Sequence, residues 1–326
     1  MSNKKSVSQI LVFIILIAIV IVGILVKINI DNNIIQINNF KYENLNINKE
    51  ELNIFYLDVG QADSTFITIN GCNMLIDSGN DQDGYYIWEF LKAQNISKID
   101  YFILTHCDED HIGGAYRIIE ELEIGSIYMP NKENETKTYQ KLLNTIENYN
   151  IKVDRSIKSS KEKQYPIGNA YWKVLSIDAK NDLNDSSMVV ELSYKDTKYL
   201  FMGDATTTVE KMIEWDEVDV LKVAHHGSNS STSQEFLNMV KPKYAIISVG
   251  LNNSSRHPDS EVIDRLQKNN IEVHRTDSEH TIWINSDGNI IKISTLEYSL
   301  DGTGRKQAIF FERKYLYAFF FASFRI

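Results

Sequence analysis

The chain is poor in cysteine and in net positive charge. It holds only two cysteines in 326 residues, Cys72 and Cys107, which is too few for a disulfide framework. Its formal net charge is -10, whereas proteins that bind long nucleic acids nonspecifically rely on a basic surface that releases counterions. Any contact with nucleic acid must therefore be local.

Hydrophobic residues are concentrated at the N-terminus. Residues 10–26 form an uninterrupted apolar run, close to the roughly 17–25 residues that cross a bilayer. No small-residue cleavage site follows the run, although a cleaved signal remains the alternative. With Lys4 and Lys5 on the cytoplasmic side, the pattern predicts a single-pass cell-membrane protein, with residues 10–26 in the lipid bilayer and the rest of the chain outside the cytoplasm.

The sequence divides into four parts. After the anchor (1–27) we expect an Asn- and Ile-rich tether (28–50), a folded domain (51–297) and an aromatic-rich tail with no assigned role (298–326). In the domain, strand-like runs alternate with helical patterns, which predicts two sheets with helices outside them. Helices are expected at 85–96, 114–122, 135–149, 206–214, 232–240 and 259–268.

The stretch ILTHCDEDHIGG (103–114) crowds histidines and acids at the end of an apolar strand. We expect the helix that follows to begin near Ile112. Carboxylates that converge at a buried strand end are costly without a compensating cation. Histidine and aspartate together are ligands of Zn²⁺, Mn²⁺ and Fe²⁺. The residues in question are His106, Asp108, Asp110 and His111, and they predict a divalent metal site.

Other predicted strands end in the same chemistry. Asp77 ends NMLID, Asp204 ends KYLFMGD, and His225 with His226 ends VDVLKVAHHG. Such endings are unremarkable singly, but together they supply further partners for a metal centre at one edge of the fold.

These motifs resemble a known family. THCDEDHIGG looks like the His-x-His-x-Asp-His signature of the metallo-β-lactamase fold, with Asp108 in place of the second histidine. Together with YLDVGQADS, LIDSG, NDSSMVVEL, FMGDA, LKVAHHGS and HPDSEVIDRL, it is similar to the C-terminal hydrolase domain of the ComEC-type DNA-uptake proteins and to phosphorylcholine esterases. The resemblance implies an αββα metallo-β-lactamase sandwich, an α/β fold, preceded here by one transmembrane helix.

The resemblance also implies roles at the metal centre, which would hold two divalent ions, Zn²⁺ or Mn²⁺, or a single one. Asp204 would bridge the ions, Asp77 would orient a ligand histidine, and Asn184 would lie beside the site where the family usually has another histidine. Neighbours on an extended segment point to opposite sides, so one residue of the pair 225–226 is expected to bind metal and the other to face substrate. The implied metal ligands are His106, Asp108, Asp110, His111, Asp204 and His226.

The activity implied by the resemblance is phosphodiester hydrolysis by an activated water. The catalytic set would be Asp110, His225 and His257, with the histidines donating a proton or hydrogen bond to phosphate. The favoured substrate is single-stranded DNA in a competence-like context, with a separate DNA-channel protein as partner. One alternative is a small-molecule or teichoic-acid phosphodiesterase, for which Tyr85, Tyr86 and Trp88 are candidates for a choline cage. Another is a non-catalytic metal-binding surface protein.

Overall fold

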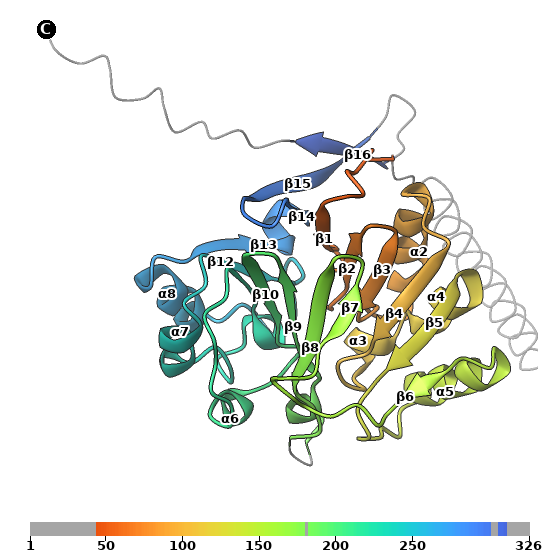
Figure 1. Ribbon diagram of the computed structural model, residues 1–326, viewed down its shortest axis with the longest axis horizontal. Helices are drawn as coiled ribbons and strands as arrows, with labels where there is room; N and C mark the ends of the chain where they lie inside the picture. The colour runs from red at the N-terminus through yellow and green to blue at the C-terminus, as the bar shows by residue number, and fades with distance from the viewer. Residues whose placement is uncertain (1–43, 180–181, 301–305, 312–326) are drawn as a thin grey trace, which may run out of the picture. The chain divides into compact units, whose positions relative to one another are not determined.

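The computed structural model describes residues 44–179, 182–300 and 306–311. Within that part, the residues from 44 to 298 belong to one compact unit, which is built on two sheets (Figure 1). The first has the strand order β16-β15-β14-β1-β2-β3-β4-β5-β6 and the second the order β13-β12-β11-β10-β9-β8-β7.

The strands of the first sheet are β1 (Leu52–Tyr56), β2 (Thr65–Ile69), β3 (Cys72–Ile76), β4 (Lys98–Ile103), β5 (Glu123–Tyr128), β6 (Val153–Asp154), β14 (Thr281–Ser286), β15 (Ile291–Leu300) and β16 (Lys306–Phe311). Those of the second are β7 (Tyr165–Ile167), β8 (Ala170–Ser176), β9 (Val189–Tyr194), β10 (Thr197–Phe201), β11 (Val220–Lys222), β12 (Tyr244–Ile247) and β13 (Glu272–Arg275).

The helices lie between these strands in sequence. They are α2 (Asp83–Ala93), α3 (Glu109–Ile112), α4 (Ala115–Glu121), α5 (Lys137–Asn148), α6 (Thr207–Glu210), α7 (Gln234–Val240), α8 (Ser260–Lys268) and α9 (Thr276–Glu279), with 3₁₀ turns η1 (Asn184–Ser186) and η2 (Ala224–Gly227).

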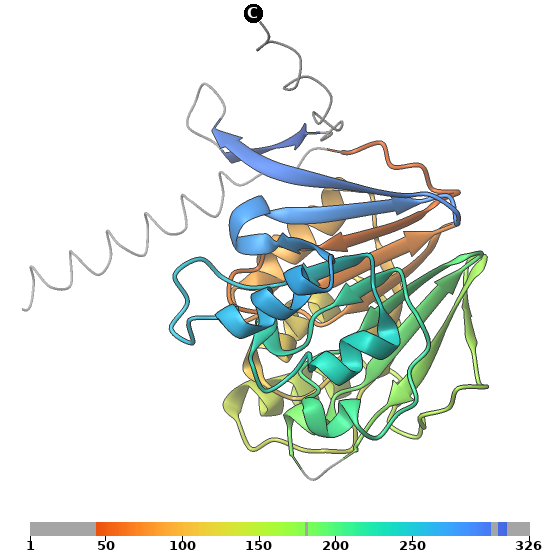
Figure 2. The same cartoon turned by 90° about the vertical axis from the view of Figure 1, so that its left-hand side faces the viewer.

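The core consists of three layers. One lies between the two sheets, and one lies on the outer face of each sheet, under the helices. Between the sheets, Tyr56 of β1 stacks on Phe201 of β10, and Trp172 of β8 is fully buried. On the outer face of the second sheet, Trp215 packs edge-on against Phe236 of α7. On the outer face of the first, Phe90 of α2 packs against the strands. The predicted αββα sandwich is confirmed, as the turned view in Figure 2 also shows.

Parallel pairing determines where the polar segments meet. β3 pairs in parallel with β4, and β10 with β11. Strands that run in parallel end at the same edge of their sheet, which is where open α/β sheets place ligand sites. The segments that follow these four strands carry the acids and imidazoles picked out above.

Several local predictions were wrong in detail. The helix expected from Ile112 begins earlier, at Glu109, so Asp110 and His111 lie on the helical turn α3. The helix expected over 206–214 ends at Glu210, whose backbone carbonyl accepts a hydrogen bond from the Trp215 indole instead of continuing the helix. Strand β5 was missed; it contains Gly125, a residue that weakens the strand pattern.

The predicted anchor (1–27) lies outside the described residues, as do most of the tether and most of the tail. Among the residues that the structure does describe, no helix is both long enough and apolar enough to cross a membrane.

Candidate metal centre

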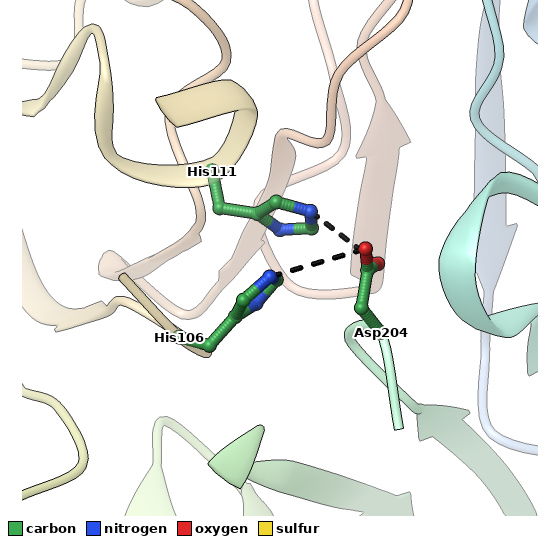
Figure 3. A group of neighbouring side chains, drawn as sticks. All are labelled: His106, His111 and Asp204. Atoms are coloured by element: carbon green, nitrogen blue, oxygen red, sulfur yellow. Dashed lines mark ion pairs between the residues drawn. The ribbon is translucent and has the colours of Figure 1, made fainter. Parts of the chain in front are cut away.

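His106 and His111 form the buried floor of the site. His106 follows β4, His111 lies on α3, both are fully buried, and their ring centroids are 4.1 Å apart. The Asp204 carboxylate after β10 faces both rings: Oδ1 is 3.3 Å from His111 Nε2, and Oδ2 is 3.9 Å from His106 Nε2 (Figure 3). The bridging role that the resemblance implies for Asp204 needs a carboxylate that reaches both imidazoles, and Asp204 lies near both.

Asp108 closes one side of this group. Its Oδ2 lies 3.5 Å from His106 Nε2, and its side chain is 34% exposed. Asn134 holds the carboxylate through Nδ2, 3.4 Å from Oδ1. Asp108 therefore marks a solvent-facing side of the site, next to His106 as predicted.

A second group of possible ligands comprises Asp110, His111 and His226. His226 Nε2 lies 3.2 Å from Asp110 Oδ2, while its Nδ1 lies 2.9 Å from the carbonyl of Ser248. A ring whose Nδ1–H donates to that carbonyl presents the lone pair of Nε2 toward the site. Of the two adjacent histidines, His226 is thus the one that faces Asp110 and His111.

The two adjacent histidines are not on an extended segment, so the reason given for their opposite directions was wrong. They lie in η2 with positive φ angles, 52° for His225 and 53° for His226. Left-handed backbone is unusual for non-glycine residues and is found where surrounding structure enforces it. The next residue, Gly227, would place a Cβ 2.6 Å from Pro258 Cβ, so this turn needs glycine.

His225 and His257 lie together near Asp204. His225 Nε2 is 3.8 Å from Asp204 Oδ2, its side chain is 27% exposed, and its ring centroid is 5.8 Å from that of His257. The His225 Nδ1 lies 3.1 Å from the Ser230 hydroxyl. The resemblance implies that these histidines face the phosphate, which stays a prediction; the structure shows that they are neighbours and that His225 lies near Asp204.

Asp77 contacts His111 directly and His106 through Thr105. It follows β3 with a φ of 60°. Its Oδ2 lies 2.8 Å from His111 Nδ1 and accepts a hydrogen bond from the Thr105 hydroxyl at 2.7 Å. That hydroxyl is also 3.2 Å from His106 Nδ1, so one carboxylate reaches one imidazole directly and the other through Thr105.

Asn184 lies in η1, where its backbone carbonyl accepts a hydrogen bond from Ser187. The contact with the bridging position is made by Ser187, whose hydroxyl accepts from the backbone N–H of Asp204 at 3.1 Å. Asp185 accepts from the backbone N–H and hydroxyl of Thr206. This segment therefore supports the Asp204 loop through hydroxyl and backbone groups.

Sequence reasoning missed one buried ion pair at the site. Lys222 Nζ lies 2.7 Å from Asp63 Oδ2, and both side chains are almost fully buried. The other oxygen of Asp63 is 3.5 Å from His226 Nδ1. The pair joins residues 159 positions apart, so no local pattern could have revealed it.

The electrostatics of the site show strong coupling between imidazoles and carboxylates. Burial alone would lower the pKa of His111, but Asp204 and Asp77 outweigh it and raise that pKa well above its usual value. Burial would raise the pKa of Asp110, yet His111 and His226 bring it down to about 2. The Asp204 pKa is likewise well below its usual value, because neighbouring imidazoles outweigh burial. The carboxylates around His111 therefore stabilise positive charge in the site.

The donor set fits a divalent cation. His106 Nε2, His111 Nε2 and Asp204 Oδ1 are buried atoms without a hydrogen-bond partner among the described residues, and they belong to one group of possible ligands. Leaving such atoms unpaired is costly, and a metal ion satisfies imidazole and carboxylate together.

Comparison with known proteins agrees with this geometry. A family model described as the metallo-beta-lactamase superfamily matches residues 57–250. The chain belongs to the metallo-beta-lactamase superfamily. The site residues named above lie inside the matched range of this superfamily model, except His257, which follows its last residue, 250.

Curated relatives extend the comparison. The chain is similar to ComE operon protein 3 of Bacillus subtilis, with 31% identity over 250 residues, covering 69% of this chain and 32% of that protein. It is 28% identical over 239 residues to Recombination protein 2 of Haemophilus influenzae, covering 70% and 28%. It is 26% identical over 230 residues to competence protein ComA of Neisseria gonorrhoeae, covering 68% and 30%. The chain thus spans about a third of the length of these relatives.

Proposed function

We propose that this chain is a metal-dependent phosphodiesterase that cleaves single-stranded DNA. The observation that carries the proposal is the clustering of three imidazoles and three carboxylates after the ends of the parallel strands, in two groups of possible ligands that share His111. The proposed ligands are those expected from the sequence: His106, Asp108, Asp110, His111, Asp204 and His226.

The likeness to proteins named for competence and recombination supports DNA as the substrate. The superfamily fold supports hydrolysis. We further propose that residues 10–26 anchor the chain in the cell membrane, that the hydrolase domain lies outside the cytoplasm, and that a separate channel protein would be needed for DNA to enter the cell.

Divalent cations at such a centre supply Lewis acidity toward phosphoryl oxygens and lower the pKa of water to about 7. Zn²⁺ and Mn²⁺ both suit this set of nitrogen and oxygen donors, whether one or two ions bind. The remaining chemistry falls to the chain itself.

The chain's own residues orient the phosphodiester and move the proton. His225, whose Nε2 is 3.8 Å from Asp204 Oδ2, and its neighbour His257 would flank the phosphate, within reach of the leaving oxygen. One of these imidazoles donates a hydrogen bond to a phosphate oxygen, and the other returns a proton to the leaving group. Asp77, through His111 and Thr105, keeps both floor imidazoles aimed at the centre.

A small phosphodiester is the second candidate substrate. A phosphodiester with a choline head group would need an aromatic cage near the metal centre. Tyr85, Tyr86 and Trp88 are the candidates for such a cage. These residues lie on α2 and pack edge-on or tilted against one another, and the Lys92 ammonium lies over the Trp88 ring at 4.4 Å. That ring face is already covered by a cation of the same chain, so the cluster lends this candidate little support.

The decisive experiment is cleavage of labelled single-stranded DNA by the full chain in detergent, with Mn²⁺, with Zn²⁺ and with chelator. Asp204→Ala is the blank, and Asp196→Ala, an exposed turn residue of the same type, is the matched control. We expect metal-dependent cutting that Asp204→Ala abolishes and Asp196→Ala leaves intact.

Two other results would redirect the proposal. Absence of DNA cutting, together with metal-dependent hydrolysis of a small phosphodiester, would move the substrate to small molecules or teichoic-acid-like polymers. Metal binding without hydrolysis of either substrate would favour the non-catalytic surface protein.

A further inference from the structure

A short basic loop lies between β6 and β7 in a chain whose net charge is -10 (Figure 1). We define the basic loop as residues 155–163. It carries four basic residues and one acidic residue, a net charge of +3. The side chains of Lys158, Lys161 and Lys163 are exposed. A polyanion that approaches this acidic protein would find favourable potential here.

The basic loop is held in place at three points. Arg155 donates hydrogen bonds to the Pro130 carbonyl at 3.2 Å and to the Tyr139 hydroxyl at 2.9 Å. Ile157 is 5% exposed and belongs to the core between the sheets. The Ser160 N–H donates to the carbonyl of Val174 in β8 at 2.8 Å. The exposed lysines are therefore presented from a fixed backbone.

A chain of contacts leads from the basic loop to the metal centre. The Asn131 side chain donates to the Arg155 carbonyl at 3.2 Å. Three residues further on, the Asn134 side chain donates to the Cys107 carbonyl at 3.0 Å and lies 3.4 Å from Asp108. The short segment 131–134 thus links the basic loop to the expected ligand Asp108.

That ligand lies on the accessible side of the centre. The side chains of Asp108 and Asp110 are 34% and 32% exposed, whereas those of His106, His111 and Asp204 are 5% exposed or less. A substrate must enter where the ligands meet solvent. Segment 131–134 joins the start of the basic loop, at Arg155, to this exposed side of the centre.

We propose that the basic loop is the docking track for the backbone of single-stranded DNA, with Lys158, Lys161 and Lys163 each contacting a phosphate as the strand leads to the metal centre. The inference rests on the proposed function, because it names where that substrate binds. Single strands are commonly bound by grooves and tracks of cations that follow the backbone without reading bases.

The test is the salt dependence of binding. Fluorescein-labelled oligodeoxythymidylate is titrated with the full chain carrying Asp204→Asn, which prevents cleavage, and anisotropy is followed from about 50 to 200 mM salt. The same titration is made with a second variant, which carries K158Q, K161Q and K163Q in addition to Asp204→Asn. Loss of three phosphate contacts should weaken binding and make the slope of log K against log salt shallower by about 2.

The matched control removes the same charge at the opposite edge of the second sheet. Lys241, Lys243 and Lys268 lie beside the start of β12 or at the end of α8, and all are exposed. Their replacement by glutamine should leave the slope unchanged. Equal effects of the two triple variants, or no effect of the first, would overturn the proposal, since general charge would then explain the binding.

The inference can fail separately from the proposed function. If the chain cuts DNA and the basic-loop variant binds and cuts it as well as the parent does, the track is wrong and the nuclease stands. If the parent shows no binding to the oligonucleotide, the track is likewise overturned, whatever small phosphodiesters the centre hydrolyses. If binding depends on the basic loop but no cleavage occurs with any metal, the track stands and the proposed nuclease falls.

Discussion

Asp77 Oδ2 lies 2.8 Å from His111 Nδ1, a contact between residues 34 positions apart that joins the end of β3 to α3. The same carboxylate accepts hydrogen bonds from the backbone N–H and the hydroxyl of Thr105, each at 2.7 Å. Asp77 is therefore the group that fixes the orientation of the site's floor.

Replacing Asp77 by Asn should weaken metal binding. An amide cannot accept from three donors as a carboxylate does, so the tautomer and direction of the His111 ring would no longer be fixed. Loss of such supporting partners typically lowers metal affinity about 10–100-fold. Calorimetric titration with Mn²⁺ measures the change, and unchanged affinity in a folded variant would show that Asp77 does not orient a ligand.

Replacing His257 by Ala should reduce turnover while leaving metal content unchanged. Loss of a general acid typically costs about 10²–10⁴ in kcat, and His257 lies beside His225 rather than among the expected ligands. Metal analysis and kcat are compared with those of His280→Ala, which removes a partly exposed histidine near Asp58. A fall in metal content would reassign His257 to metal binding.

Replacing Lys222 by Met should destabilise the fold strongly. The change leaves the buried Asp63 carboxylate without its cation, and breaking a buried pair in this way costs about 3–5 kcal/mol. Adding Asp63→Asn should recover part of the loss. Urea unfolding measures both variants against Lys98→Met, which removes a cation that pairs with Glu123 at an exposed site and should change the free energy of unfolding little.

Asp83 should make the stability of the fold depend on pH. Burial, only partly offset by hydrogen bonds from Asn80, raises the pKa of this carboxyl to about 6. The folded chain then holds the proton more tightly than the unfolded chain does. The contribution of Asp83 therefore falls as pH rises from about 4 to 6, reaching a cost of about 3 kcal/mol above pH 6.

Asp83→Asn should remove this part of the pH dependence. Urea unfolding at pH 4.5 and at pH 7 should show the parent losing more free energy of unfolding between the two values than the variant does. Equal losses of the free energy of unfolding in the parent and in the variant would mean that the Asp83 carboxyl ionises freely in the fold.

Replacing Gly114 by Ala should disturb the packing of α4 on α2. A Cβ at this position would overlap the Ser78 carbonyl and lie 2.6 Å from Gly84 Cα, both backbone atoms. Overpacking of this kind costs about 1–3 kcal/mol. Gly71→Asn is the matched control, since its Cβ would meet nothing within 4 Å and asparagine tolerates its positive φ. A Tm unchanged by Gly114→Ala would contradict the packing argument.

Much of this protein could be derived from its sequence. The strand-like runs became β1 to β4 and β8 to β14, because alternation and apolar runs are local signals that survive folding. Acids and imidazoles at the ends of parallel strands must lie near a common edge, so the crowding of THCDEDHIGG already indicated a cation site. The residue patterns gave two sheets with helices outside them, and the resemblance of the motifs to the metallo-β-lactamase family implied the specific fold.

Only the tertiary structure decided which groups meet. It placed His226 rather than His225 beside Asp110, through a left-handed turn that no residue pattern indicates. It also paired Lys222 with Asp63 across 159 positions and linked the basic loop to Asp108 through Asn131 and Asn134. The sequence determines which side chains exist and which face of each element they occupy. Contacts between distant segments depend on how whole sheets pack, and that is a property of the assembled fold.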